Sequence, residues 1–316
     1  MKIKSISKKP FNGKVYNFAC APDHTYIANN IVVHNCYKSN SPKGDNMSFE
    51  TFKKIIDIFP KTLTQIAIGA DATLKCNPDI WKMMEYARSL NIVPNITAAD
   101  IDDETADKLT KYCGAVAISC YSWSKEICYD SIKRLTDRGM KQVNMHFMVA
   151  EETYDNALET LNDIKNDPRL SELNALVFLS LKKKGRAVIN HYNCLSQEKF
   201  NKLVEKAREM NISIGFDTCS AKKALVAFNN DSAIAKMVSS CESSRESSYI
   251  NYRGEYFPCS FTEGTDGWET GLNVLECNNS QEFIDKIWNH PRTQAFRDHL
   301  EKCVYSGCKS CPIYEI

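Results

Sequence analysis

Between residues 48 and 217, apolar segments typical of strands alternate with amphipathic segments typical of helices. This alternation is the pattern of βα units, whose strands form a parallel sheet. The sequence therefore predicts an α/β fold, in which a helix opens the series with no strand before it. The expected strands are 64–68, 92–97, 115–120, 142–149, 176–181 and 212–217. The expected helices are 48–59, 77–89, 103–112, 128–138, 154–166 and 196–210.

The pattern changes after residue 219. A helix is expected over 221–238, a hairpin over 249–258 that turns at Arg253-Gly254, and a final helix over 280–300, followed by a cysteine-rich tail. This change in the sequence pattern predicts a separate α+β unit at the C-terminal end.

Composition excludes several classes of protein. The net charge of +1 gives no electrostatic footprint for nucleic acid, and no apolar run is long enough to span a membrane. The basic N-terminus lacks the apolar region of a signal peptide, so a cytoplasmic chain is expected, in which thiols stay reduced. Six of the fourteen cysteines stand alone and are expected as small core residues: Cys76, Cys113, Cys120, Cys128, Cys194 and Cys277.

Residues 1–36 differ from the rest. Short β-type segments flank an Asn12-Gly13 turn, and the segment ends in His34-Asn35-Cys36. An asparagine side chain can attack its own backbone carbonyl and release the amine of the next residue. His34 can assist that proton transfer, and the Cys36 thiolate is a strong nucleophile.

The run from residue 15 to Cys36, with Asp23 and His24 upstream of His34-Asn35-Cys36, resembles the two C-terminal splicing blocks of inteins. The resemblance implies that Asn35 cyclises, that His34, Asp23 and His24 support branch resolution, and that Cys36 is the first extein residue. It implies a split intein whose partner is an N-terminal intein/extein chain. Five lysines against one acid in residues 1–35 would speed association with an acidic partner. A β-rich extension with a chance tripeptide is the alternative.

From Cys36 onward, Cys36-Tyr37-Lys38-Ser39-Asn40 and the segment 46–52 resemble the sequence after the third cysteine of CxxxCxxC in radical S-adenosylmethionine enzymes. The resemblance implies a 4Fe–4S cluster that binds S-adenosyl-L-methionine and generates a 5′-deoxyadenosyl radical. It also implies a partial (β/α)6 TIM-like barrel that lacks its first strand. That strand and the first two cluster cysteines would be supplied by the partner chain.

The same resemblance suggests residues that hold the cofactor. A GGE-like stretch ends the first strand, and polar or charged residues lie at or after the ends of later strands, where such barrels build their sites. An ordinary loop cap, polar strand ends and a solvated basic loop are the alternatives. The candidate residues are Gly69, Asp71, Asn95, Thr97, Ser119, His146 and Arg186.

In the C-terminal part, Cys241 is separated by twelve residues from Gly254, and four residues separate Gly254 from Cys259. This spacing and the tail cysteines resemble SPASM and twitch iron–sulfur domains, and the short tail favours a twitch-like domain with one auxiliary 4Fe–4S cluster. Four thiolates are required; zinc is the alternative metal. The expected ligands are Cys241, Cys259, Cys308 and Cys311, with Cys303 in reserve.

The expected organisation is therefore an intein fragment at 1–35, a radical S-adenosylmethionine core at 36–215 and an auxiliary domain at 216–316. The expected function is that of a splicing precursor which becomes an enzyme acting on a peptide or protein. A non-catalytic metal-binding protein and a degraded enzyme fragment are the alternatives.

Overall fold

The computed structural model describes residues 45–69, 74–229, 241–265 and 267–301, together with two short antiparallel strands, β1 (Ile27–Ala28) and β2 (Ile31–Val32). The rest of the segment assigned to an intein fragment, and the junction that ends it, lie outside the described residues.

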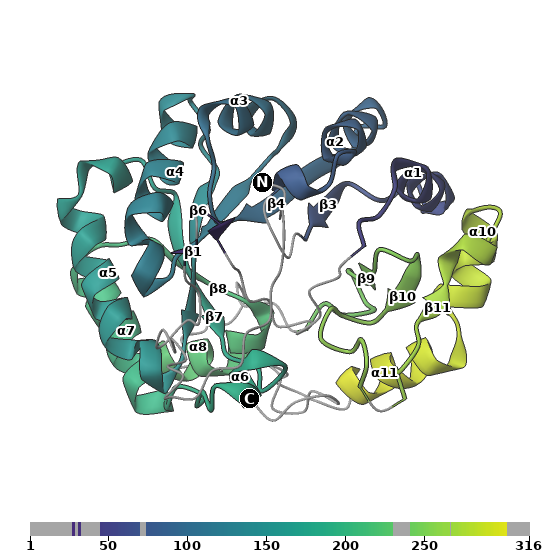
Figure 1. The fold of residues 1–316 in the computed structure, drawn as a ribbon. Helices are drawn as coiled ribbons and strands as arrows, with labels where there is room; N and C mark the ends of the chain where they lie inside the picture. Colours follow the sequence, from purple (N-terminus) through teal and green to yellow (C-terminus); the bar gives the residue numbers. More distant parts are fainter. Residues whose placement is uncertain are drawn as a thin grey trace, which may run out of the picture.

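The centre of the structure is a six-stranded sheet in which every neighbouring pair is parallel. The strands follow one another in chain order, so each connection leads to the adjacent strand (Figure 1). This confirms the predicted parallel sheet. Its strands are β3 (Gln65–Ile68), β4 (Val93–Ala98), β5 (Val116–Ser119), β6 (Val143–Val149), β7 (Ala175–Ser180) and β8 (Ile214–Phe216).

Helices connect the strands, and several begin at side-chain caps that their sequences supply. The Ser48 hydroxyl accepts the amide of Thr51 at 3.1 Å, and the Asp102 carboxylate accepts the amide of Thr105 at 3.0 Å, which satisfies a backbone donor at each helix start. The helices are α1 (Phe49–Ile58), α2 (Ile80–Ser89), α3 (Asp103–Tyr112), α4 (Lys125–Asp137), α5 (Tyr154–Asn166), α6 (Arg186–Ile189), α7 (Gln197–Glu209) and α8 (Ala221–Ala227). The predicted helix 221–238 is thus confirmed over α8, and residues 230–240 lie outside the described part.

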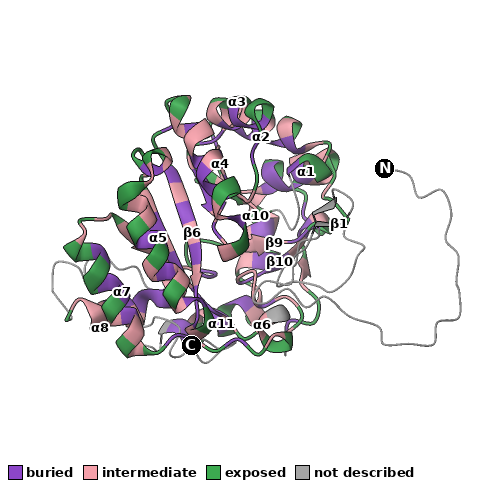
Figure 2. Cartoon of the chain, turned by 60° about the vertical axis from the view of Figure 1, so that its left-hand side comes forward, coloured by how far each residue is buried: buried purple, intermediate pink, exposed green. Residues whose placement is uncertain are grey.

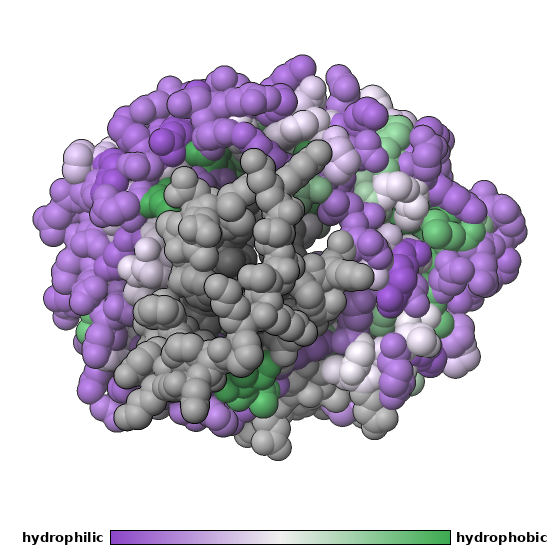
Figure 3. All heavy atoms as spheres, viewed as in Figure 1, coloured by the Kyte–Doolittle hydropathy of each residue, from purple (hydrophilic) through white to green (hydrophobic). Residues whose placement is uncertain are grey.

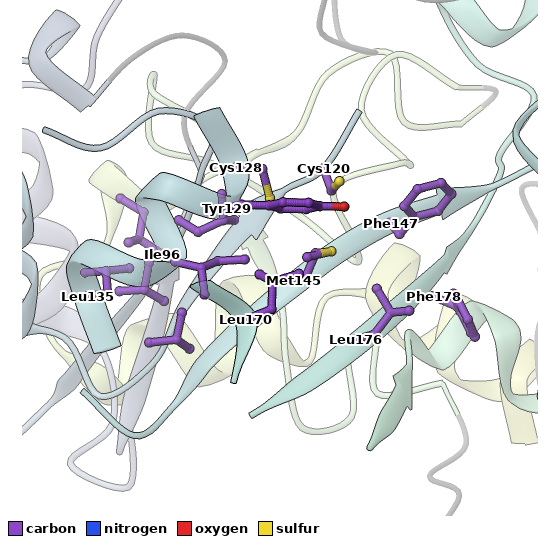
Figure 4. Close-up of a cluster of buried hydrophobic side chains, with 14 of the residues drawn as sticks. Ile96, Cys120, Cys128, Tyr129, Leu135, Met145, Phe147, Leu170, Leu176 and Phe178 are labelled. Atoms are coloured by element: carbon purple, nitrogen blue, oxygen red, sulfur yellow. The ribbon is translucent and has the colours of Figure 1, made fainter. Parts of the chain in front are cut away.

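The main core lies between the sheet and the helices on one of its faces. Alternate residues of β6 are buried (Figure 2). Met145 and Phe147 belong to the core beneath the helices (Figure 4), so His146 between them faces the opposite side of the sheet. We call that opposite face the inner face. Hydrophilic residues dominate the outer rim of the molecule in the view of Figure 3, as expected for helices whose apolar sides cover a sheet.

The predicted core role of the isolated cysteines is confirmed for most of them. Cys113, Cys120, Cys128 and Cys277 are buried, and Cys194 is partly buried. Cys76 is exposed, so the prediction that it is a core residue was wrong. It ends a short 3₁₀ turn, Leu74–Cys76, in which Leu74 is the residue that enters the core.

The C-terminal part contains a small antiparallel sheet of β9 (Tyr249–Ile250), β10 (Glu255–Phe257) and β11 (Leu272–Asn273). Its core includes Tyr256 and Phe283, and it also takes in Ile55 and Ile58 from α1. The Lys54 ammonium donates to the Leu275 carbonyl at 2.6 Å. Helix α1 therefore packs against both the sheet-bearing part and the C-terminal part (Figure 1).

The prediction of a single helix over 280–300 was wrong. The structure has α10 (Ser280–Phe283), a π-helical turn (Ile284–Trp288), and then a separate helix, α11 (Pro291–Glu301). Pro291 has no N–H to give to the Ile287 carbonyl and its ring would clash with that turn, so the helix restarts at the proline. The Thr293 hydroxyl donates to the Ile287 carbonyl instead, at 2.9 Å.

Candidate functional site

The inner face of the sheet brings three of the candidate residues close together: one ends β5, one is the next-to-last residue of β4, and one lies at the middle of β6. Ser119 of β5 is directly opposite His146 of β6, and Thr97 of β4 is paired with Ala117, two residues before Ser119. All three lie on the inner face, because the residues that alternate with them, such as Ile96 and Ile118, are buried in the helix-covered core. Gly69 directly follows β3 and is exposed.

Asn95 has a different position. It is the third residue of β4 and pairs with Ala67 of β3. Its amide donates to Gln65 Oε1 at 3.1 Å, and its Oδ1 accepts the Ala115 backbone amide at 2.8 Å. These two bonds link the starts of β3, β4 and β5. The geometry therefore favours a structural role for Asn95 over the predicted contact with a cofactor.

His146 occupies a partly buried position on the inner face. Loss of solvation lowers the pKa of its imidazole, and the opposing effect of Asp217, which raises it, is smaller. Among the described residues, no side-chain hydrogen bond of His146 is formed. The neutral imidazole can therefore either donate or accept a hydrogen bond.

This burial predicts a pH dependence of stability. The unfolded chain takes up a proton at His146 near pH 6.5, whereas the folded chain resists it. The free energy of unfolding should therefore fall as the pH drops through and below about 6.5. Urea unfolding of His146→Gln at several pH values should show a weaker decline than unfolding of the parent chain. An equal decline in the two proteins would contradict the assignment.

A buried polar cluster lies beside His146, after β7 and β8. The Lys182 ammonium forms an ion pair with Asp217, with only 8% and 18% of the two side chains exposed. Asp217 also accepts the backbone amides of Ser180 and Ser220, at 3.3 and 3.0 Å. Lys182 lies 5.2 Å from the ring centre of Phe261 in the C-terminal part.

In the loop 182–186 the sequence predicted a cofactor contact for Arg186, with a solvated basic loop as the alternative. Asp217, Lys184 and Phe261 were not predicted. One signal was present for Asp217, because it directly follows the last strand, where such sheets place functional residues. Arg186 begins α6, and its side chain is outside the described structure. Asp71 also lies outside it.

The C-terminal part brings two cysteine-bearing segments together. The Ser244 hydroxyl, three residues after Cys241, lies 2.7 Å from the Tyr256 hydroxyl, three residues before Cys259. The Arg297 guanidinium donates to the Ser244 carbonyl at 3.2 Å, which attaches the first segment to α11. Cys241 is 8% exposed and packs with Phe296 and Leu300 of that helix.

A glycine sets the turn between these segments. The backbone of Gly254 has a φ of +80°, which side chains other than glycine's rarely allow, and a Cβ there would lie 2.7 Å from Leu275 Cγ. This confirms the predicted turn at Arg253-Gly254. It also explains why a glycine stands between Cys241 and Cys259.

Replacing Gly254 with alanine should lower the free energy of unfolding by about 2–5 kcal/mol, the sum of the positive-φ cost and the overlap with Leu275. Gly264 is the matched control, because it has a φ of +76° but a Cβ there would meet nothing within 4 Å. Gly264→Ala should cost only about 1–2 kcal/mol. Equal losses in urea unfolding would show that contact with Leu275 is unimportant.

Thiolates are the ligands that iron–sulfur clusters require, and two paired segments carrying Cys241 and Cys259 fit half of such a ligand set. Within the described ranges, no three His, Cys, Asp or Glu side chains converge as a metal site. The other predicted metal ligands, Cys36, Cys308 and Cys311, and the reserve Cys303, lie outside the described residues. So do the splicing residues Asp23, His24, His34 and Asn35.

Comparison with known families decides the nature of this part. The sequence matches the SPASM family, an iron–sulfur cluster-binding domain, over residues 241–312. The C-terminal part is thus an iron–sulfur domain. SPASM domains are associated with radical S-adenosylmethionine enzymes, which supports the corresponding part of the predicted resemblance. No curated protein matches the chain. None of the helices described is long and apolar enough to cross a membrane.

Proposed function

We propose that this chain is the C-terminal precursor of a radical S-adenosylmethionine enzyme and is completed by protein trans-splicing with an N-terminal split-intein/extein chain. The observation that carries the enzyme part of the proposal is the combination of an SPASM domain with a six-stranded, sequentially ordered parallel sheet. A sheet of βα units and an SPASM domain are the two parts that the resemblance implies.

The proposed architecture is a partial (β/α)6 barrel. Helices on one face and a polar inner face with Ser119 and His146 support it. Among the described residues, β3 pairs only with β4, and its sequence Gln65-Ile66-Ala67-Ile68 has neither a charge nor a proline to protect an edge. We therefore propose that a strand supplied by the partner pairs with β3.

The inner face is the proposed site for S-adenosyl-L-methionine. Bound to a reduced 4Fe–4S cluster, this cofactor supplies the 5′-deoxyadenosyl radical. Gly69 would leave room for the cofactor beside β3, since nothing lies within 4 Å of the position of a Cβ there. Ser119 and the neutral His146 would offer hydrogen bonds to its polar groups. Thr97, Asp71 and Arg186 complete the proposed contacts.

The proposed auxiliary cluster is bound by Cys241, Cys259, Cys308 and Cys311 in a twitch-like arrangement. The Ser244–Tyr256 contact supports the first pair, because it joins the segments that bear them. Leu300, one residue before the end of α11, packs with Cys241 and is only eight residues before Cys308. The tail cysteines are consequently within reach of Cys241.

Splicing rests on the sequence His34-Asn35-Cys36. In the proposed reaction, Cys36 is first the nucleophile that accepts the N-terminal extein and afterwards the third ligand of the catalytic cluster. A peptide or protein is the proposed substrate of the assembled enzyme, by analogy with other enzymes that carry this C-terminal extension.

Iron content before and after splicing tests the proposal. The isolated chain should bind about four iron atoms, all in the auxiliary cluster, whereas the ligated product should bind about eight and form 5′-deoxyadenosine when reduced with S-adenosyl-L-methionine. A ligated product with no more iron than the precursor, and with no cofactor cleavage, would show that splicing does not build a radical enzyme.

A further inference from the structure

The loop that follows β10 carries Cys259 and is fastened by a side chain from the other part of the protein. Lys184, in the connection between β7 and α6, donates to the Phe261 carbonyl at 3.0 Å and to the Glu263 carbonyl at 2.5 Å. These carbonyls belong to the second and fourth residues after Cys259. A single ammonium thus joins the carboxyl end of the parallel sheet to the cysteine loop.

The loop is also tied within itself. The Thr262 amide and hydroxyl both donate to the Cys259 carbonyl, at 3.1 and 2.7 Å, and the Thr265 amide donates to the Thr262 carbonyl at 3.0 Å. Thr262 is completely buried. A displacement at Phe261 or Glu263 would therefore be passed to Cys259 through a short, hydrogen-bonded turn.

A second lysine borders the same loop, but it already has a strong partner. Lys182 lies over the Phe261 ring and is paired with Asp217, so its charge is largely balanced. Lys184 instead directs its charge at backbone carbonyls of the loop. Lys183 between them is exposed. The three consecutive lysines therefore have three different environments.

We propose that Lys184 is a positioning residue for the auxiliary cluster: it holds the Cys259 loop against the carboxyl end of β7 and sets both the geometry and the reduction potential of the cluster. This inference rests on cluster binding by the C-terminal domain, with Cys259 as a ligand, and not on splicing. Hydrogen bonds and charges around the ligands tune the potential of iron–sulfur clusters, and a nearby cation favours the reduced, more negative state.

The first test needs no cluster. Hydrogen exchange of the purified full chain should become faster at the Thr262 and Thr265 amides in Lys184→Met, because the loop loses its outer attachment. Lys184→Arg, which keeps charged donors, should restore most of the protection. Lys183→Met is the matched control and should exchange like the parent. Unchanged exchange in Lys184→Met would overturn the positioning role.

The second test measures the cluster itself. After anaerobic reconstitution, the midpoint potential followed by electron paramagnetic resonance should shift to more negative values in Lys184→Met and stay near the parent value in Lys183→Met and Lys184→Arg. If exchange rises but the potential does not move, Lys184 only braces the loop and the proposal is wrong. If the parent chain binds no iron, the claim that this domain holds a cluster is wrong. The exchange test then still shows whether Lys184 holds the loop.

Discussion

Replacing Cys259 with alanine is expected to remove nearly all of the iron that the isolated chain should bind after anaerobic reconstitution, which is about four atoms per chain. A 4Fe–4S cluster of this kind needs four thiolates, and the loss of one leaves an iron open to solvent and oxidation. Cys259 lies two residues after the end of β10, in a loop held by hydrogen bonds from Thr262 and Lys184. A replacement residue from elsewhere in the described part is therefore not expected to take its place. Iron and sulfide assays and the visible spectrum measure the loss.

Two other cysteines provide controls. Cys277 is fully buried in the C-terminal core, so Cys277→Ala should keep its iron even if stability falls. Cys36→Ala should also keep it, because the proposed catalytic site of the unspliced chain lacks its first two ligands. A Cys259→Ala chain that retains full iron would remove this residue from the ligand set.

Replacing Asn35 with alanine is expected to abolish release of the ligated product when the chain is produced together with its N-terminal partner. Only a side-chain amide at this position can cyclise onto the Asn35 carbonyl and free the amine of Cys36. Blocked material should accumulate as precursor or as a branched species, which intact-mass spectrometry resolves.

Asn40→Ala is the matched control for Asn35, since Asn40 lies on the extein side of the junction and takes no part in the proposed reaction. It should splice like the parent chain. Undiminished ligation in Asn35→Ala would be incompatible with intein chemistry at this junction.

The sheet and its helices were predictable from local pattern. Each strand has apolar residues at the period of two or as a continuous run, and caps such as Ser48 and Asp102 mark helix starts. The shared role of α1 was not predictable, because Ile55 and Ile58 pack against residues about 200 positions later in the chain. Pro291 itself indicates the break between the two helices, but the prediction ran a single helix through it.

The site was predictable where a simple geometric rule applies. Gly254 is at the predicted turn. The sheet places Ser119 directly beside His146, while their contact with a cofactor stays a prediction. The predicted cofactor contact of Asn95 stays a prediction, and its bonds to Gln65 and Ala115 favour a structural role instead. Contacts such as the hydrogen bond from Lys184 to the Phe261 carbonyl join segments far apart in the sequence, and no local sequence pattern predicts them.

The most direct test of the central claim is a tryptic map of the mature protein isolated from its natural source. Trypsin cuts after Lys14 and Lys38, so an unspliced chain yields a peptide of residues 15–38 that contains intact His34-Asn35-Cys36. We expect instead a peptide in which residues of another polypeptide are joined directly to Cys36-Tyr37-Lys38. Recovery of only the 15–38 peptide would contradict the account.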